Sequence, residues 1–128
     1  DGEASASLEV VPERGGIITR WKVNGQDILY LDEERFANPD LSVRGGIPIL
    51  FPICGNLPDN AYVHNGKSYP LKQHGFARDL PWEVIEQSTE GSASLTLKLS
   101  SNELTRSLYP FEFDLHFTYV LKGNTLTL

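Results

Sequence analysis

Two Asn-Gly dipeptides, Asn24-Gly25 and Asn65-Gly66, each lie between two short runs of strand-forming residues. A two-residue type I′ turn requires positive φ at both central positions, which Asn and Gly tolerate, so each dipeptide predicts a β-hairpin. The first turn would join strands at 17–23 and 26–31. Gly123-Asn124 separates the last two strand-like runs in a similar way. These turns favour antiparallel pairing of neighbouring strands.

Alternating hydrophobicity favours the same fold class. Leucine occupies every second position from Leu95 to Leu99, which is the period of a half-buried strand. A longer alternation runs from Phe111 to Leu121. Only residues 32–37 and 101–107 have the composition of a helical turn. The sequence therefore predicts an all-β fold, an antiparallel β-sandwich.

Residues 38–81 form a different kind of stretch, rich in proline and glycine and with few clean alternations. Long irregular connections in a compact domain are usually either functional or disordered. This one contains too many apolar residues, Phe51 and Phe76 among them, to be disordered. We expect an ordered, packed loop region that carries a site on a β scaffold. Trp21 and Trp82, on either side of it, are expected in the core.

Composition limits the size, the partners and the compartment. The chain has 128 residues, 40% of them hydrophobic, which is enough for one domain with its own core. No repeat or linker divides it, so residues 1–128 are expected to form a single domain. A net charge of −6 argues against nucleic acid or an anionic membrane as partner. A small anion stays possible, because two well-placed arginines can bind one.

Cys54 is the single cysteine, so no internal disulfide can form, which fits a reducing, cytoplasmic location. No apolar run approaches the roughly 20 residues needed to span a bilayer. The first seven residues lack the basic start and apolar stretch of a signal peptide. They also lack an initiator methionine, which we interpret as a trimmed N-terminus.

The segment from Gln73 to Arg78, Gln-His-Gly-Phe-Ala-Arg, contains the residues best suited to hold a small ligand. It offers an amide, the titratable imidazole of His74 and a guanidinium within six positions. About thirty residues earlier, Arg44 stands directly before two glycines, where a turn would expose backbone N–H groups beside a second guanidinium. Both arginines also have a plain interpretation as surface residues in weak ion pairs, with Asp79, Asp40 or Glu34 as partners.

Other chemistries have weaker support. A nucleophilic thiol would pair Cys54 with His74, but the apolar residues around Cys54 are expected to keep that thiol inert. A metal site needs three or four ligands, and the three histidines show no metal-ligand spacing, so we expect no metal. His64 is expected at a solvated hairpin tip and His116 on the polar face of its strand. The acidic run 32–34 is expected to be a solvated helical turn.

Together these motifs resemble the aldose 1-epimerase superfamily, and most closely its hexose-6-phosphate mutarotase (glucose-6-phosphate 1-epimerase) branch. The resemblance rests on Arg-Gly-Gly-Ile-Pro at 44–48 with Phe51-Pro52, on the 73–78 segment with Trp82, and on Tyr-Pro-Phe at 109–111. With the Val-Pro-Glu-Arg-Gly-Gly run that begins at Val11, it covers nearly the whole chain. It implies the N-terminal portion of a galactose-mutarotase-like β-supersandwich with a sugar site in a cleft on the large sheet.

The resemblance also implies a cofactor-free isomerase that interconverts the α and β anomers of an aldohexose. A base takes the anomeric proton, an acid protonates the ring oxygen, the ring opens, and reclosure gives the other anomer. In this picture Arg44 and Arg78 bind the substrate through its phosphate, Gln73 binds a hydroxyl, and His74 lies close to the ring. The family's catalytic histidine and glutamate follow the position of Leu128, so this chain contributes no catalytic residue. We therefore expect an N-terminal fragment of a longer enzyme, inactive when isolated.

Two alternatives stay open from the sequence. The chain can be a sugar- or sugar-phosphate-binding β module without activity, which the missing catalytic positions favour. It can also be a plain β-sandwich interaction domain, although that leaves the glycine-rich stretch between Arg44 and Arg78 unexplained. The identity of the hexose, the need for a phosphate and the oligomeric state are open at this point.

Overall fold

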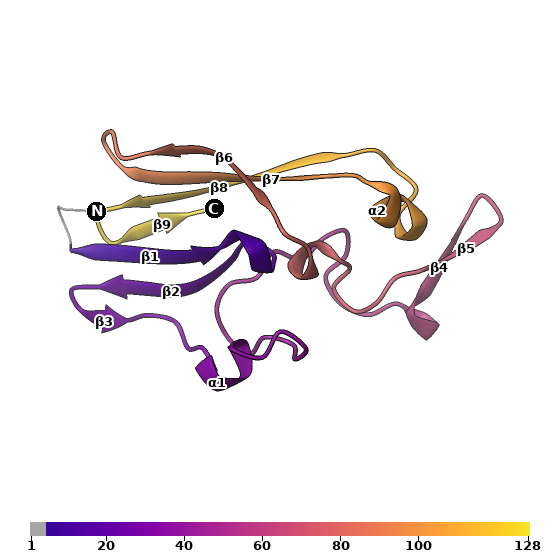
Figure 1. Ribbon diagram of the computed structural model, residues 1–128, viewed down its shortest axis with the longest axis horizontal. Helices are drawn as coiled ribbons and strands as arrows, with labels where there is room; N and C mark the ends of the chain where they lie inside the picture. Colours follow the sequence, from indigo (N-terminus) through magenta and orange to yellow (C-terminus); the bar gives the residue numbers. More distant parts are fainter. Residues whose placement is uncertain (1–4) are drawn as a thin grey trace.

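A computed structural model describes residues 5–128, and within them every strand pairs antiparallel with its neighbours. One sheet has the order β1-β2-β3, a two-stranded sheet pairs β4 with β5, and a third has the order β6-β7-β8-β9 (Figure 1). Their bounds are β1 (Ala6–Val11), β2 (Ile17–Val23), β3 (Gln26–Asp27), β4 (Ala61–His64), β5 (Lys67–Pro70), β6 (Glu83–Ser88), β7 (Ala93–Ser100), β8 (Asp114–Lys122) and β9 (Thr125–Thr127). The all-β expectation is confirmed.

Short helical segments connect the strands. They are η1 (Pro12–Arg14), α1 (Glu33–Phe36), η2 (Pro58–Asn60), η3 (Ala77–Asp79) and α2 (Glu103–Leu108). The two α-helices fall where helical turns are expected from the sequence, and a side chain caps each N-terminus: Asp32 accepts from the Arg35 N–H at 3.0 Å, and Asn102 from the Thr105 N–H at 2.9 Å. No helix among residues 5–128 is long and apolar enough to cross a membrane.

The three predicted turns lie where the sequence places them. Asn24-Gly25 joins β2 to β3, Asn65-Gly66 joins β4 to β5, and Gly123-Asn124 joins β8 to β9. Asn24 and Asn65 each have φ of 50°, and the glycines after them have φ of 81° and 76°, as the turn type requires. Figure 1 shows the β4–β5 hairpin projecting at the end of the molecule opposite the termini.

Two predicted strands are shorter in the structure. The run 26–31 is a strand only at Gln26–Asp27, because beyond it Tyr30 accepts from the Gly46 N–H at 2.8 Å and Leu31 bridges Gly45. The alternation that starts at Phe111 becomes β8 only at Asp114. Before that point, the Phe111 N–H donates to the Tyr109 carbonyl oxygen at 2.8 Å. That local turn replaces the sheet pairing.

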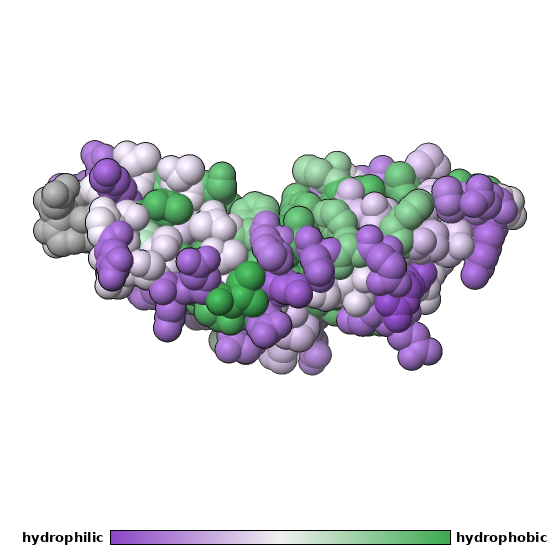
Figure 2. Space-filling model, turned by 90° about the horizontal axis from the view of Figure 1, so that it is seen from above, coloured by the Kyte–Doolittle hydropathy of each residue, from purple (hydrophilic) through white to green (hydrophobic). Residues whose placement is uncertain are grey.

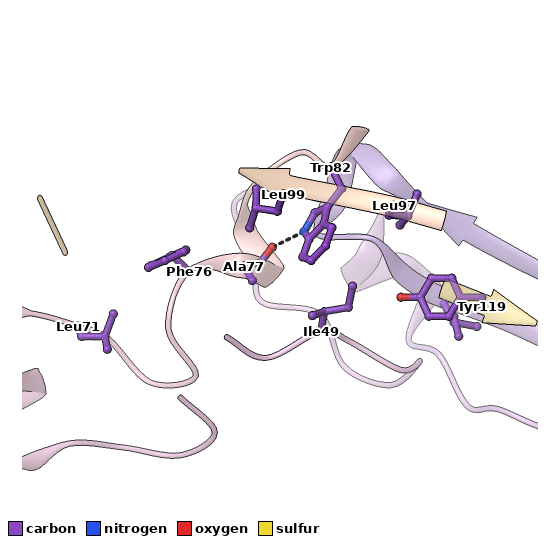
Figure 3. Close-up of a cluster of buried hydrophobic side chains, with 9 residues drawn as sticks. Ile49, Leu71, Phe76, Ala77, Trp82, Leu97, Leu99 and Tyr119 are labelled. Carbon is purple, nitrogen blue, oxygen red and sulfur yellow. Dashed lines mark hydrogen bonds between the residues drawn. The ribbon is translucent and has the colours of Figure 1, made fainter. Parts of the chain in front are cut away.

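A single hydrophobic cluster joins the β1–β3 sheet, the β6–β9 sheet and the loop region. Leu97 from β7 and Ile18 from β2 are fully buried, and Tyr119 from β8 is 2% exposed. Trp82 is 4% exposed and its indole N–H donates to the Ala77 carbonyl oxygen at 3.0 Å (Figure 3). The expectation that Trp82 belongs to the core is confirmed.

Trp21 differs from the expectation. It is only half-buried, and its indole N–H is enclosed without a hydrogen-bond acceptor among residues 5–128. It lies on β2, where it pairs with Leu8 of β1. The pattern of the strand alone does not distinguish this partly covered position from a core position.

The proline- and glycine-rich stretch 38–81 is packed, as expected. Ile49, Leu71, Phe76 and Ala77 belong to the central cluster. Glycines allow the stretch to approach its neighbours: a Cβ on Gly45 would lie 2.1 Å from the Tyr30 carbonyl oxygen. Residues 1–4, part of the segment that lacks signal-peptide features, lie outside the described residues.

Candidate functional site

The two segments singled out from the sequence lie side by side at Phe51. The Phe51 carbonyl oxygen accepts from the N–H groups of Phe76 at 3.0 Å and Ala77 at 3.2 Å, and Phe51 forms a bridge with Gly75. The approach requires glycine, because a Cβ on Gly75 would lie 2.3 Å from that oxygen. The Gln-His-Gly-Phe-Ala-Arg segment is therefore fixed against the strand-like run that follows Arg44.

His74 is held by two hydrogen bonds to one residue. Its backbone N–H donates to the Gly55 carbonyl oxygen at 2.9 Å, and the Gly55 N–H donates to His74 Nδ1 at 2.8 Å. A ring nitrogen that accepts carries no proton, so the neutral imidazole has its proton on Nε2. Nε2 has no hydrogen-bond partner among residues 5–128, and it is not among the buried unpartnered atoms, so it is accessible. His74 has φ of 64°, a left-handed conformation.

Arg44 and Arg78 form no ion pair with any residue the structure describes. The Arg44 side chain is exposed and has no hydrogen-bond partner there. Arg78, in η3, donates from Nη2 to the Gln73 carbonyl oxygen at 3.3 Å, while its Nε is buried without a partner. Asp79, an expected partner, binds Lys72 at 2.7 Å instead. The plain interpretation of both arginines as ion-paired surface residues is therefore wrong for the described chain.

The other arginines are engaged. Arg14 donates to three backbone carbonyl oxygens, Arg20 binds three carboxylates, Arg35 binds Ser42, and Arg106 binds Glu112. Within residues 5–128, Arg14 and Arg35 also lack a carboxylate partner, but each makes two or more hydrogen bonds to backbone carbonyl or hydroxyl oxygens, whereas the Arg44 side chain makes none and Arg78 makes one. An anionic ligand can supply the missing acceptors.

The two glycines after Arg44 do not present free backbone donors as a pair. The Gly46 N–H donates to the Tyr30 carbonyl oxygen at 2.8 Å, and the next N–H, of Ile47, donates to Ile18 at 2.9 Å. A Cβ on Gly46 would lie 2.5 Å from the Ile18 carbonyl oxygen. These glycines serve close backbone packing, and the expected anion-binding turn is not formed by Gly46.

A cavity of about 470 Å³ adjoins Arg78. It is lined by parts of η1, the loop 39–45 and η3, including Glu13, Arg14, Val43, Gly45 and Arg78. Gln73 and His74 do not line it. Gln73 is exposed and lies beside His74. Gln73, His74 and Arg78 lie on one segment, in which the Arg78 side chain contacts the Gln73 carbonyl oxygen, while Arg44 stands between two lining residues of the cavity, Val43 and Gly45.

The structure confirms the expectation for His116 and corrects those for His64 and Cys54. His116 is exposed on its strand, as expected. His64 is half-buried rather than solvated, because its ring lies 5.1 Å from that of Phe111. Cys54 is exposed, so the apolar neighbours in its sequence do not enclose the thiol. No group of three or more metal-ligand side chains gathers within residues 5–128.

Gly55 is the site residue that the sequence did not reveal. Its contacts with His74 are made by the backbone alone, and 19 positions separate the two residues, so no side-chain pattern predicts them. The one available signal is the glycine itself, whose φ of 124° is a conformation that other residues avoid. The next residue, Asn56, is exposed.

Figure 2 shows the molecule from above, with hydrophobic side chains gathered among hydrophilic ones over the half that carries α2 and the β4–β5 hairpin. Large exposed apolar residues of that half include Leu104 and Phe111. A second hollow, of about 670 Å³, lies at the other end between β1 and the strands β6, β7 and β8. None of the four predicted ligand-binding residues lines it.

The antiparallel fold is that of a galactose-mutarotase-like β protein, and comparisons with known proteins agree. The aldose 1-epimerase family model matches residues 3–128. The chain belongs to the aldose 1-epimerase family.

Solved structures are similar over almost the whole chain. The Slr1438 protein of Synechocystis sp. PCC 6803 is 61% identical, with a TM-score of 0.96, over 98% of this chain and 44% of that one. A galactose mutarotase related enzyme from Lactobacillus acidophilus is 34% identical, with a TM-score of 0.81, over 98% of this chain and 39% of that one. The N-terminal part of a galactose-mutarotase-like fold, expected from the resemblance, is confirmed.

A protein of Salmonella typhimurium named "Putative glucose-6-phosphate 1-epimerase" is 31% identical over 104 residues, which are 80% of this chain and 32% of that protein. Protein LacX of Lactococcus lactis subsp. lactis is 30% identical over 118 residues, which are 88% of this chain and 36% of LacX. The chain thus spans about a third of the length of these curated relatives.

Proposed function

We propose that this chain forms the substrate-holding part of a sugar mutarotase and that its ligand is a hexose 6-phosphate. The observation that carries the proposal is the pair Arg44 and Arg78, the two arginines among residues 5–128 that have no acidic partner and at most one side-chain hydrogen bond, in a chain with net charge −6. In such a chain carboxylates are plentiful, so two guanidinium groups left with neither a carboxylate nor a full set of oxygen acceptors are suited to a ligand anion. The name of the Salmonella typhimurium relative supports glucose 6-phosphate as the first ligand to test.

Each residue has a role in the proposal. Arg44 and Arg78 bind the phosphate, the Gln73 amide binds a sugar hydroxyl, and His74 directs Nε2 toward the ring. Mutarotation then needs one group to take the anomeric proton and another to protonate the ring oxygen. His74 makes side-chain hydrogen bonds only to Gly55 within the described residues, and no carboxylate is paired with it. We assign binding and orientation to this chain, and the proton-transfer pair to the region by which the relatives are longer.

A second candidate is a sugar-phosphate-binding module without activity. The observation that favours it is the same absence of a carboxylate paired with His74 among residues 5–128. The two candidates share the binding step and differ only in catalysis.

Binding is tested by titrating the 128-residue chain with glucose 6-phosphate and with glucose and recording NMR spectra. The rate of anomer exchange is measured on the same samples. We expect Arg44→Ala and Arg78→Ala each to weaken glucose 6-phosphate binding about tenfold to a hundredfold, since hydrogen bonds to charged groups contribute about 1.5–3 kcal/mol. Glucose binding should change much less. Lys122→Ala is the matched control, because the exposed Lys122 ammonium also makes no ion pair or hydrogen bond with the described residues.

Equal weakening of glucose and glucose 6-phosphate would contradict the phosphate assignment. Absence of binding by the unmodified chain would contradict the proposed function. Both candidates predict binding without accelerated anomer exchange for this chain alone, and accelerated exchange would contradict the assignment of the proton-transfer pair to another region.

A further inference from the structure

Gly55 and His74 form a closed pair of hydrogen bonds that does more than hold a loop. The bond from the His74 N–H to Gly55 O fixes the backbone at 2.9 Å, and the bond from the Gly55 N–H to Nδ1 at 2.8 Å fixes the ring. A neutral imidazole has one donor nitrogen and one acceptor nitrogen. With the Nδ1 lone pair occupied, the nitrogen left for a ligand is Nε2, and it carries the proton.

We propose that Gly55 is a positioning residue. Because its N–H occupies Nδ1 of His74, the imidazole donates a hydrogen bond to the ligand through Nε2 and does not accept a proton from it. The proposal rests on the proposed function, because it takes a sugar as the ligand that His74 meets. The bound group is then an oxygen with a free lone pair, such as a ring or hydroxyl oxygen of the sugar.

The backbone of Gly55 explains why a glycine stands there. A Cβ at this position would meet no atom within 4 Å, so space does not require glycine. The φ of 124° does, because residues with a side chain rarely adopt it. The conformation aims the N–H of Gly55 at the ring, so the glycine acts on His74 through its backbone.

The first test needs no ligand. In the 15N-labelled chain, NMR should show a coupling across the hydrogen bond between the Gly55 amide nitrogen and His74 Nδ1, with Nε2 in the protonated range. A protonated Nδ1 in the neutral ring, or a Gly55 amide without that coupling and exchanging freely with water, would overturn the proposal.

Two substitutions then separate the two ring nitrogens. His74→Asn places an amide oxygen near the Nδ1 position, and asparagine tolerates the left-handed φ of 64°, so the bond from Gly55 should persist while the donor at Nε2 is lost. His74→Gln keeps a donor near the Nε2 position but loses the acceptor for Gly55. We expect both variants to bind glucose 6-phosphate about tenfold more weakly, and only His74→Asn to keep the protected Gly55 amide.

Each variant has its own contrary result. Full affinity in His74→Asn would show that the Nε2 donor is not used, and full affinity in His74→Gln would show that Gly55 does not position it. The NMR coupling, measured on the unmodified chain without ligand, tests the hydrogen bond between Gly55 and His74 even if neither variant folds. If the unmodified chain binds no glucose 6-phosphate while the coupling is present, the proposed function fails and the assignment of the tautomer stands.

Discussion

At the scale of single residues, glycines set how closely the loop region packs, and two of them allow a matched comparison. Gly75 and Gly66 have similar φ values, 67° and 76°, but a Cβ on Gly75 would lie 2.3 Å from the Phe51 carbonyl oxygen, while one on Gly66 would meet nothing within 4 Å. Gly66→Ala should cost about 1 kcal/mol of unfolding free energy from backbone strain alone. Gly75→Ala should cost about 3 kcal/mol, because the clash is added.

Urea unfolding followed by circular dichroism measures both free energies. Equal losses in the two variants would mean that the backbone around Phe51 yields to the new Cβ. The closeness of the 51 and 75 segments would then be incidental.

The residue scale also marks the limit of what the sequence reveals about the site. The pattern around His74 identifies the imidazole, since a histidine before a glycine and near an arginine is visible as a motif. The bonds to Gly55 are invisible, because backbone groups are the same at every position. The Gly-Gly pair after Arg44 illustrates the reverse: it suggested anion binding, whereas Gly46 packs against Ile18.

At the scale of elements, the corner between β7 and β8 is held by carboxylates that bind neighbouring hydroxyls. The bond from Ser100 lowers the pKa of Asp114, helped by Lys98. The bond from Ser101 likewise lowers the pKa of Glu112. A lowered pKa in the folded state means stability that is present above the ordinary value, about 4, and lost as the pH falls through the lowered one.

Ser100→Ala should therefore raise the pKa of Asp114 toward its ordinary value and lessen the loss of stability on acidification. An NMR titration of the Asp114 carboxyl carbon measures the first effect, and urea unfolding at pH 6 and pH 3 measures the second. Ser107→Ala is the control, because that hydroxyl donates to the Leu104 carbonyl oxygen and not to a carboxylate. An unchanged Asp114 titration in Ser100→Ala would contradict the assigned cause.

Strands and turns were predictable from the sequence where adjacent residues determine them. The Asn-Gly hairpins depend on the φ values of two adjacent residues, and the alternation that predicts β7 gives the face of each side chain. The run 26–31 was not predicted correctly, because the backbone partners of Tyr30 and Leu31 are Gly46 and Gly45, which lie about fifteen positions further along the chain. Pairing over such a distance is decided by tertiary contacts that strand propensity does not contain.

At the scale of the whole molecule, Tyr119 joins the two larger sheets. It lies on β8, burial raises the pKa of its hydroxyl, and that hydroxyl donates to the Gly16 carbonyl oxygen at 2.7 Å, just before β2. Tyr119→Phe leaves a buried carbonyl without this donor and should cost about 1–3 kcal/mol. Tyr62→Phe, which loses a 2.8 Å bond to Leu108 at a half-buried position, should cost less.

Thermal unfolding followed by calorimetry tests the comparison. If residues 1–128 form a single domain, both variants should unfold in one transition at a lowered midpoint. A Tyr119→Phe midpoint equal to that of the unmodified chain would mean that the sheets do not depend on this bond. Two separate transitions would contradict the single domain.

The bond between the Trp82 indole and the Ala77 carbonyl gives the molecule an optical reporter of its own ligand-holding segment. Ala77 stands next to Arg78 and three residues after His74, so a ligand that shifts this segment also shifts the hydrogen bond of a buried fluorophore. The wavelength and the lifetime of the Trp82 emission would then change. The half-buried Trp21, far from this segment in the sequence, is the second emitter. With Trp21→Phe as background, ligand titration can be followed by intrinsic fluorescence without any label.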